Sequence, residues 1–384
     1  MNKYLFLLGN TPKLSILELE TLLQKKTKLW RKNVAAVELE DDEQAKQLME
    51  LLGGTFKVCR IINNLPSNPK DLTSLNKAYE KIADKVSSLS EKPTFALSGL
   101  GQMSDYFSAQ ELKKVLRKKK ISCRYRKAGQ WGASASILTH EKDTLDLIVI
   151  EDEDQIYLTK TVAIQEVDEW VNRDRNKPYS SGKKGMLPPK LARIMVNLAL
   201  GNMKKKVEQP VLYDPFSGTG TILIEALLRG CQVVGSDIDH DAVAGSLENL
   251  YWLEHQYQRQ FKYQIFQADV AQADERKWET KVDSIVTEPF LGRPNPKKTN
   301  LKNIFKGLKR MYLGSFKTWA SMLKPGALVV IIFPFVQTSN FEYNLLDLID
   351  KLTEYGYTLE VSPQEYYRKW ADVKRHILIF RYQE

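Results

Sequence analysis

Cysteine and histidine are scarce in this sequence, which has three cysteines and four histidines among 384 residues. Cys59, Cys123 and Cys231 each lie within or beside an apolar run, and none has a cysteine or histidine neighbour at the spacing of a zinc site. We therefore expect neither a disulfide framework nor a bound metal. Isolated cysteines are typical of proteins from a reducing compartment, which favours a cytoplasmic protein.

Long hydrophobic runs, internal repeats and low-complexity segments are also missing. No run approaches the roughly 20 apolar residues that span a membrane. The N-terminal stretch MNKYLFLLGN is too short for the hydrophobic region of a signal peptide and lacks a small-residue cleavage site. With 43% hydrophobic and 27% charged residues, the chain is expected to be a soluble, intracellular globular protein.

Acidic residues are outnumbered, with 47 Asp and Glu against 57 Lys and Arg, which gives a net charge of +10. This balance permits an anionic partner without establishing one. The excess is strongest in residues 113–127, which contain nine Lys or Arg and no acid. The helical spacing of Leu112, Val115 and Leu116 predicts a buried stripe, so the cations of this helix should face outward.

These cations are candidate contacts to an RNA backbone, because clustered Lys and Arg release counterions from phosphates. Tyr125 and Trp131 lie nearby in the sequence and offer planar groups that can stack on unpaired bases. A second basic segment runs from Arg173 to Lys184. A solvated helix face is the alternative interpretation. The predicted RNA-binding residues are Lys113, Lys114, Arg117, Lys118, Lys120, Arg124 and Arg126.

Short strand and helix patterns alternate along the N-terminal half. Residues 1–65 are predicted to form a β-α-β-α-β unit, and residues 66–165 a second α+β unit whose helix at 108–120 opens with a capping box of Ser108 and Glu111. Residues 166–185 are rich in Gly, Pro, Ser and charge, which predicts a linker. From 186 to 384, regular alternation predicts a doubly wound, mostly parallel sheet.

The stretch DPFSGTGT (residues 214–221) lacks the third glycine of a dinucleotide-binding fingerprint, since Leu223 stands there. An acid ends each of three successive predicted strands: Asp214, Asp237 and Asp269. Carboxyl ends of adjacent strands line one crevice in such a sheet. Three carboxylates suit S-adenosylmethionine, which carries an amine, a ribose diol and an adenine amine, whereas they would repel a pyrophosphate. Solvated or helix-capping acids are the alternative interpretation.

The stretch TEPFLGRP (residues 287–294) follows the fourth strand, at the adjacent position of the same edge. Methyl transfer to an exocyclic amine needs an acceptor for the amine protons and a planar surface that fixes the base. We predict that Glu288 accepts from the amine, that Phe290 stacks on the base and that Pro289 stiffens the loop. An ordinary loop with a surface glutamate is the alternative.

In this order, DPFSGTGT, GSDID, QADV and TEPF resemble the motifs of class I S-adenosylmethionine-dependent amino-methyltransferases. The upstream RDRNKPYSSGKKGMLPPKLARIMVNLA and the LLGNTPKLSILELETLL start resemble the THUMP-domain tRNA guanosine-10 N2-methyltransferase family. The resemblance implies an α/β fold with a C-terminal Rossmann-like class I methyltransferase sheet and an N-terminal α+β half. The implied order is a ferredoxin-like segment (1–65), a THUMP-like RNA-binding domain (66–165), a linker (166–185) and a methyltransferase domain (186–384).

The resemblance also assigns roles to residues. Asp214, Gly218 and Gly220 would cradle the methionine end of the cofactor, Asp237 the ribose and Asp269 the adenine amine. The segment with Lys190 and Leu191 would close over it. The full set of implied cofactor-binding residues is Met186, Pro188, Asp214, Phe216, Gly218, Gly220, Asp237, Ile238, Asp269 and Val270. The family's fourth motif is (Asp/Asn)-Pro-Pro-Tyr, whereas this chain has a glutamate, one proline and an earlier aromatic in Glu288-Pro289-Phe290-Leu291.

The predicted activity is transfer of a methyl group from S-adenosylmethionine to the N2 amine of a guanosine in tRNA, at guanosine 10 by the resemblance. The partner is tRNA, and the need for a small activating partner subunit stays open. A DNA amino-methyltransferase and a catalytically silent RNA-binding subunit are the alternatives. A nicotinamide-dependent enzyme comes third.

Overall fold

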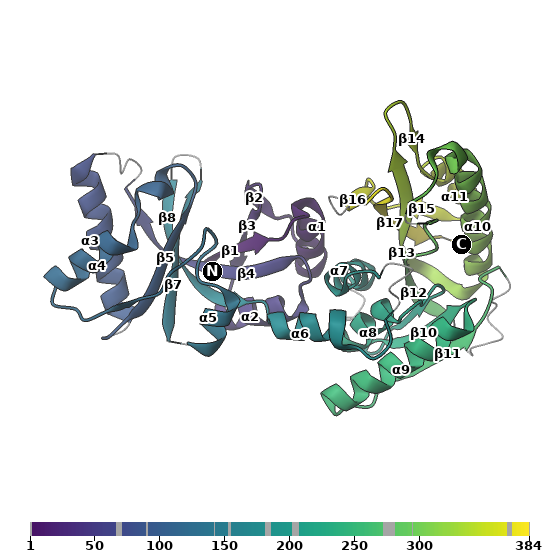
Figure 1. Cartoon of the computed structure of the whole chain (residues 1–384), viewed down its shortest axis with the longest axis horizontal. Helices are drawn as coiled ribbons and strands as arrows, with labels where there is room; N and C mark the ends of the chain where they lie inside the picture. Colours follow the sequence, from purple (N-terminus) through teal and green to yellow (C-terminus); the bar gives the residue numbers. More distant parts are fainter. Residues whose placement is uncertain are drawn as a thin grey trace. The chain divides into compact units, whose positions relative to one another are not determined.

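A computed structural model of the chain describes residues 2–66, 71–89, 91–141, 143–152, 155–180, 186–201, 207–271, 281–293, 295–366 and 371–383. The chain forms two compact units (Figure 1). The first contains residues 1–16 and 26–167, and the second contains residues 17–25 and 168–384. No helix in the described ranges is long and apolar enough to cross a membrane.

The first unit is built around one eight-stranded sheet, ordered β2-β3-β1-β4-β8-β7-β5-β6. Its strands are β1 (Asn2–Leu8), β2 (Lys28–Arg31), β3 (Val34–Leu39), β4 (Thr55–Leu65), β5 (Thr94–Leu100), β6 (Arg124–Tyr125), β7 (Thr144–Asp152) and β8 (Gln155–Ile164). Its helices are α2 (Asp42–Leu51), α3 (Leu72–Leu89), α4 (Ala109–Lys118) and α5 (Ala135–His140), and α1 (Pro12–Leu23) begins in this unit.

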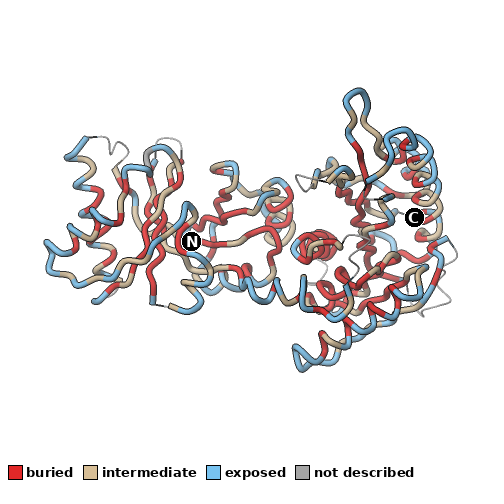
Figure 2. Tube along the Cα trace, viewed as in Figure 1, coloured by how far each residue is buried: buried red, intermediate tan, exposed pale blue. Residues whose placement is uncertain are grey.

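The predicted segments 1–65 and 66–165 contribute to the same sheet. Strand β4 pairs antiparallel with β8 from Lys57 opposite Ile164 to Leu65 opposite Ile156. The central strands carry apolar side chains on both faces, so each face can bury a core. Helices α3 and α4 cover one face and enclose Phe95, Leu147 and Leu158. Buried residues accordingly concentrate in the strands (Figure 2).

Half of the predicted capping box at α4 is present. The Glu111 amide donates to Ser108 Oγ at 3.4 Å, so Ser108 is the N-cap. In a full capping box the Glu111 carboxylate would accept from the Ser108 amide. Here the Ser108 amide donates to the Tyr79 hydroxyl, and the Glu111 carboxylate pairs with Lys114 at 2.6 Å. A tyrosine from α3 therefore satisfies the donor that the box would have used.

The second unit is built around a mixed sheet. Its strands are β9 (Val211–Asp214), β10 (Gln232–Asp237), β11 (Tyr263–Gln267), β12 (Val282–Thr287), β13 (Leu323–Gln337), β14 (Glu342–Tyr343), β15 (Tyr357–Leu359), β16 (Gln364–Tyr366) and β17 (Lys374–Tyr382). Its helices are α6 (Val167–Val171), α7 (Pro189–Leu200), α8 (Thr221–Leu228), α9 (His240–Tyr257), α10 (Leu301–Met322) and α11 (Leu348–Glu354).

The strand order of this sheet is β11-β10-β9-β12-β13-β17-β15. The first five strands run parallel, and β17 is antiparallel to both β13 and β15. Figure 1 shows α7 on one face and α10 and α11 on the other. The six residues of β12 are all buried, as a parallel strand covered on both faces requires. The predicted doubly wound, mostly parallel sheet is confirmed.

The described part of the predicted linker contains two short helical stretches. Residues Val167–Val171 form α6 and Asn172–Asn176 a π-helical turn, while 181–185 lie outside the described residues. Arg173 and Lys177 are only 5% and 4% exposed. Two cations predicted to belong to a basic RNA-facing segment are therefore buried in the second unit. Their burial depends on partners that lie far along the chain.

Candidate active site

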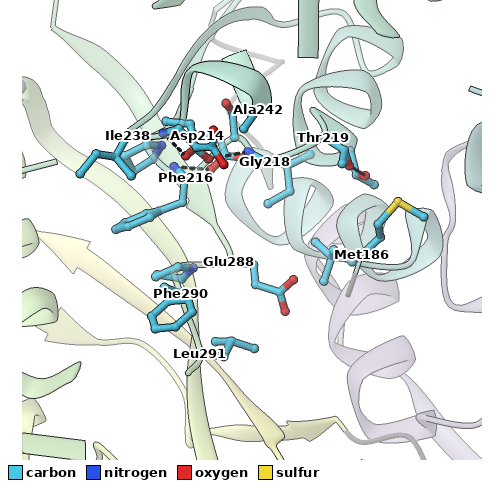
Figure 3. Close-up of a pocket in the computed structure, with 18 of the residues that line it drawn as sticks. Met186, Asp214, Phe216, Gly218, Thr219, Ile238, Ala242, Glu288, Phe290 and Leu291 are labelled. Carbon is cyan, nitrogen blue, oxygen red and sulfur yellow. Dashed lines mark hydrogen bonds between the residues drawn. The ribbon is translucent and has the colours of Figure 1, made fainter. Parts of the chain in front are cut away.

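A pocket of about 1000 Å³ opens at the carboxyl ends of β9, β10 and β12 in the second unit. Figure 3 shows Asp214 and Gly218 on one side of it, Phe290 and Leu291 on the other, and Glu288 between them. The predicted residues that line it are Met186, Asp214, Phe216, Gly218, Asp237, Ile238, Asp269, Val270, Glu288, Pro289 and Phe290. Pro188, Gly220, Lys190 and Leu191 are not among the lining residues.

The glycine turn between β9 and α8 depends on backbone conformations that favour glycine. Gly218 has φ +53° and Gly220 has φ +74°, in the left-handed region. The Gly220 amide donates to the Ser217 carbonyl at 2.7 Å, and Gly220 is the N-cap of α8. Gly220 thus shapes the turn without lining the pocket, while Gly218 and Thr219 face it.

Two polar residues of α9 hold the turn in place. Ser246 Oγ donates to the Gly218 carbonyl at 2.9 Å. Asn249 Nδ2 donates to the carbonyls of Thr219 (2.8 Å) and Tyr179 (2.9 Å), and Asn249 Oδ1 accepts from the Tyr179 amide (2.8 Å). The end of the upstream segment is therefore joined to the glycine turn through one buried amide side chain.

Asp214, at the end of β9, is almost fully buried but lines the pocket. Its Oδ1 accepts from the Thr287 hydroxyl at 2.7 Å and from the Phe216 amide at 3.1 Å. Burial raises the pKa of Asp214 to about 7, against the lowering effect of these two donors. The negative charges of Asp237 and Glu288 also raise the pKa of Asp214. A cationic ligand in the pocket would favour the ionised form.

Asp237 ends β10, Asp269 follows β11 by two residues, and both line the same pocket, as predicted from their positions. Asp237 accepts from the Gly218 amide at 2.9 Å and from the Asp239 amide at 3.0 Å. Asp269 is exposed and accepts from the Ala271 amide at 3.0 Å. These carboxylates face the pocket at successive strand ends, which is the arrangement that a ribose and an adenine amine would need.

Glu225, on α8, does not line the pocket. Its carboxylate is fully buried, with Oε1 accepting from Arg173 Nε at 2.8 Å and Oε2 paired with Arg193 Nη2 at 2.7 Å. Lys177 donates to the hydroxyls of Thr219 (3.2 Å) and Thr221 (2.8 Å), and burial lowers the pKa of Lys177 to about 8. No local sequence pattern indicates this network, because its members are spread over 52 residues.

Glu288 lies where the motif predicted, at the end of β12, but it has a partner that the sequence did not indicate. Arg375 Nε, on β17, donates to Glu288 Oε1 at 2.6 Å. Both side chains line the pocket and are 13% (Arg375) and 15% (Glu288) exposed. Phe290 is 59% exposed, so its ring is accessible for stacking. The site therefore combines a paired carboxylate with an accessible aromatic ring.

Of the predicted RNA-binding residues in the first unit, Lys113, Lys114, Arg117 and Lys118 lie on α4 and Arg124 lies on β6, while Lys120 and Arg126 lie within two residues of these elements. Lys114, Arg117, Lys118, Lys120 and Arg124 are exposed, and Lys113 is half-buried. The positive charge of this cluster is partly neutralised in the structure. Lys114 pairs with Glu111, Lys119 with Glu80 and Asp84, and Arg126 with Glu141.

The two aromatic side chains proposed for base stacking are half-buried and pack against the cores of the first unit. The Tyr125 ring lies 5.8 Å from Phe95, and the Trp131 ring lies 5.7 Å from Phe56. Over the described part of the chain, no group of three or more His, Cys, Asp or Glu side chains is placed to hold a metal ion.

Comparisons with known proteins identify relatives of the second unit. Residues 179–330, which contain most of the pocket, match the family described as the RMKL-like methyltransferase domain. A probable tRNA (guanine(10)-N2)-dimethyltransferase of Methanothermococcus thermolithotrophicus is 39% identical over 121 residues, 31% of this chain and 70% of that protein. The chain belongs to the tRNA (guanine(10)-N2)-methyltransferase family.

Similarity to this tRNA (guanine(10)-N2)-methyltransferase family is not uniform along the chain. The tRNA (guanine(10)-N2)-dimethyltransferase of Methanothermobacter thermautotrophicus is 39% identical over 142 residues, which are 36% of this chain. That match spans only 37% of the relative's length. The crystal structure of TrmN from Thermus thermophilus matches 99% of both chains with a TM-score of 0.56 and 16% identity. That likeness shows that the two chains share a fold.

Proposed function

We propose that this protein transfers a methyl group from S-adenosylmethionine to the exocyclic N2 amine of a guanosine in tRNA. The observation that carries the proposal is the position of Glu288. A partly exposed carboxylate and the Phe290 ring share one pocket with three strand-end acids and a glycine turn. The names of the family members support guanosine 10 as the target.

The residues present fit S-adenosylmethionine. Asp237 and Asp269 would accept from the ribose hydroxyls and the adenine amine, and ionised Asp214 would lie near the positively charged methionine end. The Gly218 turn leaves room for close backbone approach. When bound, the cofactor supplies an activated methyl group. The adjacent Phe216 and Val270 offer apolar surface at the pocket wall.

The substrate amine is proposed to lie against Glu288. Its carboxylate would hold an N2 proton, which orients the amine toward the methyl donor, and Phe290 would stack on the base. No strong base is needed, because the methylated amine becomes acidic and releases a proton to Glu288 or water. A guanosine in a stem must leave the helical stack to reach this depth.

The exposed cations of α4 would contact the tRNA body, and residues 66–165 would form a THUMP-like domain. A cytoplasmic location fits a tRNA-modifying enzyme. The contribution of a small activating subunit is tested by the assay below, run with the isolated chain.

The test is transfer of labelled methyl from S-adenosylmethionine to bulk unmodified tRNA, followed by nucleoside analysis of the digest. We expect labelled N2-methylguanosine or its dimethylated form. Glu288→Ala should abolish the product while cofactor binding persists, and Asp237→Ala should weaken cofactor binding with little effect on tRNA binding. Cofactor and tRNA binding without any transfer would instead support a silent RNA-binding subunit, and preference for duplex DNA a DNA amino-methyltransferase.

A further inference from the structure

Arg375 shares the pocket wall with Glu288, although 87 residues separate them in the sequence. The guanidinium Nε donates to Glu288 Oε1 at 2.6 Å, and both side chains are mostly buried. Among the described lining residues, the other arginine is the exposed Arg293. An arginine has five N–H donors in a fixed fork, so one bond to Glu288 leaves further donors on the same planar group.

Together the two side chains match one edge of one base. The Watson–Crick edge of guanine presents, in order, N2–H, N1–H and the O6 acceptor. A carboxylate accepts only, and a guanidinium donates only. If Glu288 holds the N2 amine, as the proposed function requires, the same carboxylate also faces N1–H. The next atom along this edge is O6, which needs a donor. A guanidinium that is paired with Glu288 lies beside the carboxylate and could donate to O6.

We propose that Arg375 is a specificity-determining residue that reads the O6 atom of the target guanine while Glu288 holds its N2 amine. This inference rests on the proposed function, because the register of the base is set by the reacting amine. The alternative is that Arg375 only positions Glu288. A positioning role would affect every base that carries an N2 amine equally, whereas a reading role would depend on the group at position 6.

The analogue that separates the two roles is 2,6-diaminopurine. It keeps the N2 amine but has an acceptor at N1 and an amine in place of O6, so it presents an acceptor to Glu288 and a donor to Arg375. The substrate is a tRNA in which the nucleotide methylated by the wild-type protein is guanosine or 2,6-diaminopurine. The readout is the ratio of kcat/KM for these two tRNAs.

The wild-type protein should prefer guanosine. In Arg375→Met, which keeps the volume but removes every donor, we expect this preference to fall by roughly tenfold to a hundredfold, the range of one lost base-reading contact. The guanosine substrate should account for the fall, with 2,6-diaminopurine changed little. Arg375→Lys keeps a donor without the fork and should recover part of the preference.

Arg381→Met is the matched control. Arg381 also lies on β17 and pairs with a glutamate, Glu360, at 2.6 Å, but it is not among the pocket-lining residues. The preference of the Arg381→Met variant for guanosine over 2,6-diaminopurine should equal that of the wild type. Cofactor affinity measured for each variant establishes that it is folded.

Equal loss on both substrates in Arg375→Met would overturn the reading role and leave the proposed function standing. Failure of the wild-type protein to form any N2-methylguanosine would overturn the proposed function itself, and methylation of an adenine would overturn both.

The charge of the segment that follows Glu288 carries a second inference. Between Glu288 and Glu342 the chain has nine Lys or Arg and no Asp or Glu. Most of these cations lie on or just before α10, whose apolar residues Phe305, Leu308 and Tyr312 face the core. The helical period places Lys302, Lys306, Arg310 and Lys317 on the opposite, exposed side.

The members of this stripe differ from Lys309 on the same helix. Within the described ranges, Lys302, Lys306, Arg310 and Lys317 have no acidic partner within ion-pairing distance, whereas Lys309 pairs with Asp347. The segment that leads into α10 supplies Arg293 and Asn295 to the pocket lining. Met311 of α10 also lines the pocket. The stripe extends over roughly 22 Å of this helix, at about 1.5 Å per residue.

We infer that this stripe contacts phosphates of the RNA strand that carries the target nucleotide, which again rests on the proposed RNA substrate. The test is the salt dependence of tRNA binding. Each lost phosphate contact reduces the slope of log K against log salt by about 0.7 for a single strand and about 0.9 for a duplex. Lys306→Gln together with Arg310→Gln should reduce the slope by about 1.4–1.8.

Lys309→Gln is the control on the same helix, since Asp347 already neutralises that charge, and its slope should match the wild type. An unchanged slope in the double variant, with tRNA still bound by the wild type, would overturn this inference alone. Absence of tRNA binding by the wild type would count against the proposed substrate.

Discussion

The buried carboxylate of Glu225 gives the sharpest prediction about how the catalytic unit is held together. It is the shared acceptor for Arg173, from the segment before the methyltransferase domain, and Arg193, from α7. The carboxylate is fully buried, and both guanidiniums are 6% exposed. Burial lowers the pKa of Arg173, but Glu225 and Tyr257 raise it by more, so the pKa lies above its ordinary value. The positive charge of Arg173 is therefore strongly compensated by these neighbours.

Glu225→Gln removes the negative charge but keeps the shape. It leaves two buried cations without this carboxylate, and breaking a buried pair in this way costs about 3–5 kcal/mol of unfolding free energy. For a domain of this size each kcal/mol lowers Tm by roughly 2–4 °C, so a fall of roughly 6–20 °C is expected. Thermal unfolding followed by circular dichroism measures it.

Glu169→Gln is the matched control, because Glu169 pairs with the same Arg173 at 3.2 Å but is half exposed. An exposed pair of this kind contributes about 1 kcal/mol or less. Similar effects of the two substitutions, or a loss below about 1 kcal/mol in Glu225→Gln, would refute the view that the 168–177 segment is an integral part of the second unit.

Three further predictions follow from single contacts. Burial raises the pKa of Asp214 to about 7, above an unfolded value of about 3.9, so its contribution to stability is full below about 4 and is lost as the pH rises through about 7. Asp214→Asn should flatten that part of a urea-denaturation pH profile. In the first unit, Lys57 and Asp146 form a buried pair at 2.6 Å, so Asp146→Asn should lower the free energy of unfolding by about 3–5 kcal/mol in urea denaturation. Gly220→Ala places a side chain at φ +74°, which should cost about 1–2 kcal/mol and weaken cofactor binding measured by calorimetry.

The sequence was most informative where local pattern decides structure. The apolar run before Asp214, the glycine turn and the apolar helix α8 were recognisable in order, because strand, turn and helix each have their own residue chemistry. The same holds for Asp237, which ends β10, and for Asp269, which follows β11. Helix α10 was missed although Leu301, Phe305, Leu308 and Tyr312 repeat at helical spacing, so its signal was present.

The sequence was least informative where burial is decided by distant partners. Arg173 and Lys177 lie in a segment rich in Gly, Pro and charge, which is typical of a linker. They are buried because Glu225, Thr219 and Thr221 offer acceptors. The ion pair between Glu288 and Arg375 was also not predictable from the sequence. The two residues are 87 positions apart, and nothing near either one indicates the other.

The most direct test of the central claim replaces one atom group in the substrate. Inosine is guanosine without the N2 amine and keeps N1–H and O6. In a tRNA that carries inosine at the position where the wild-type protein methylates guanosine, the account predicts no label from S-adenosylmethionine, while tRNA binding is retained. Undiminished labelling of the inosine-containing tRNA would contradict it, because the methyl group would then be going to an atom other than the amine held by Glu288.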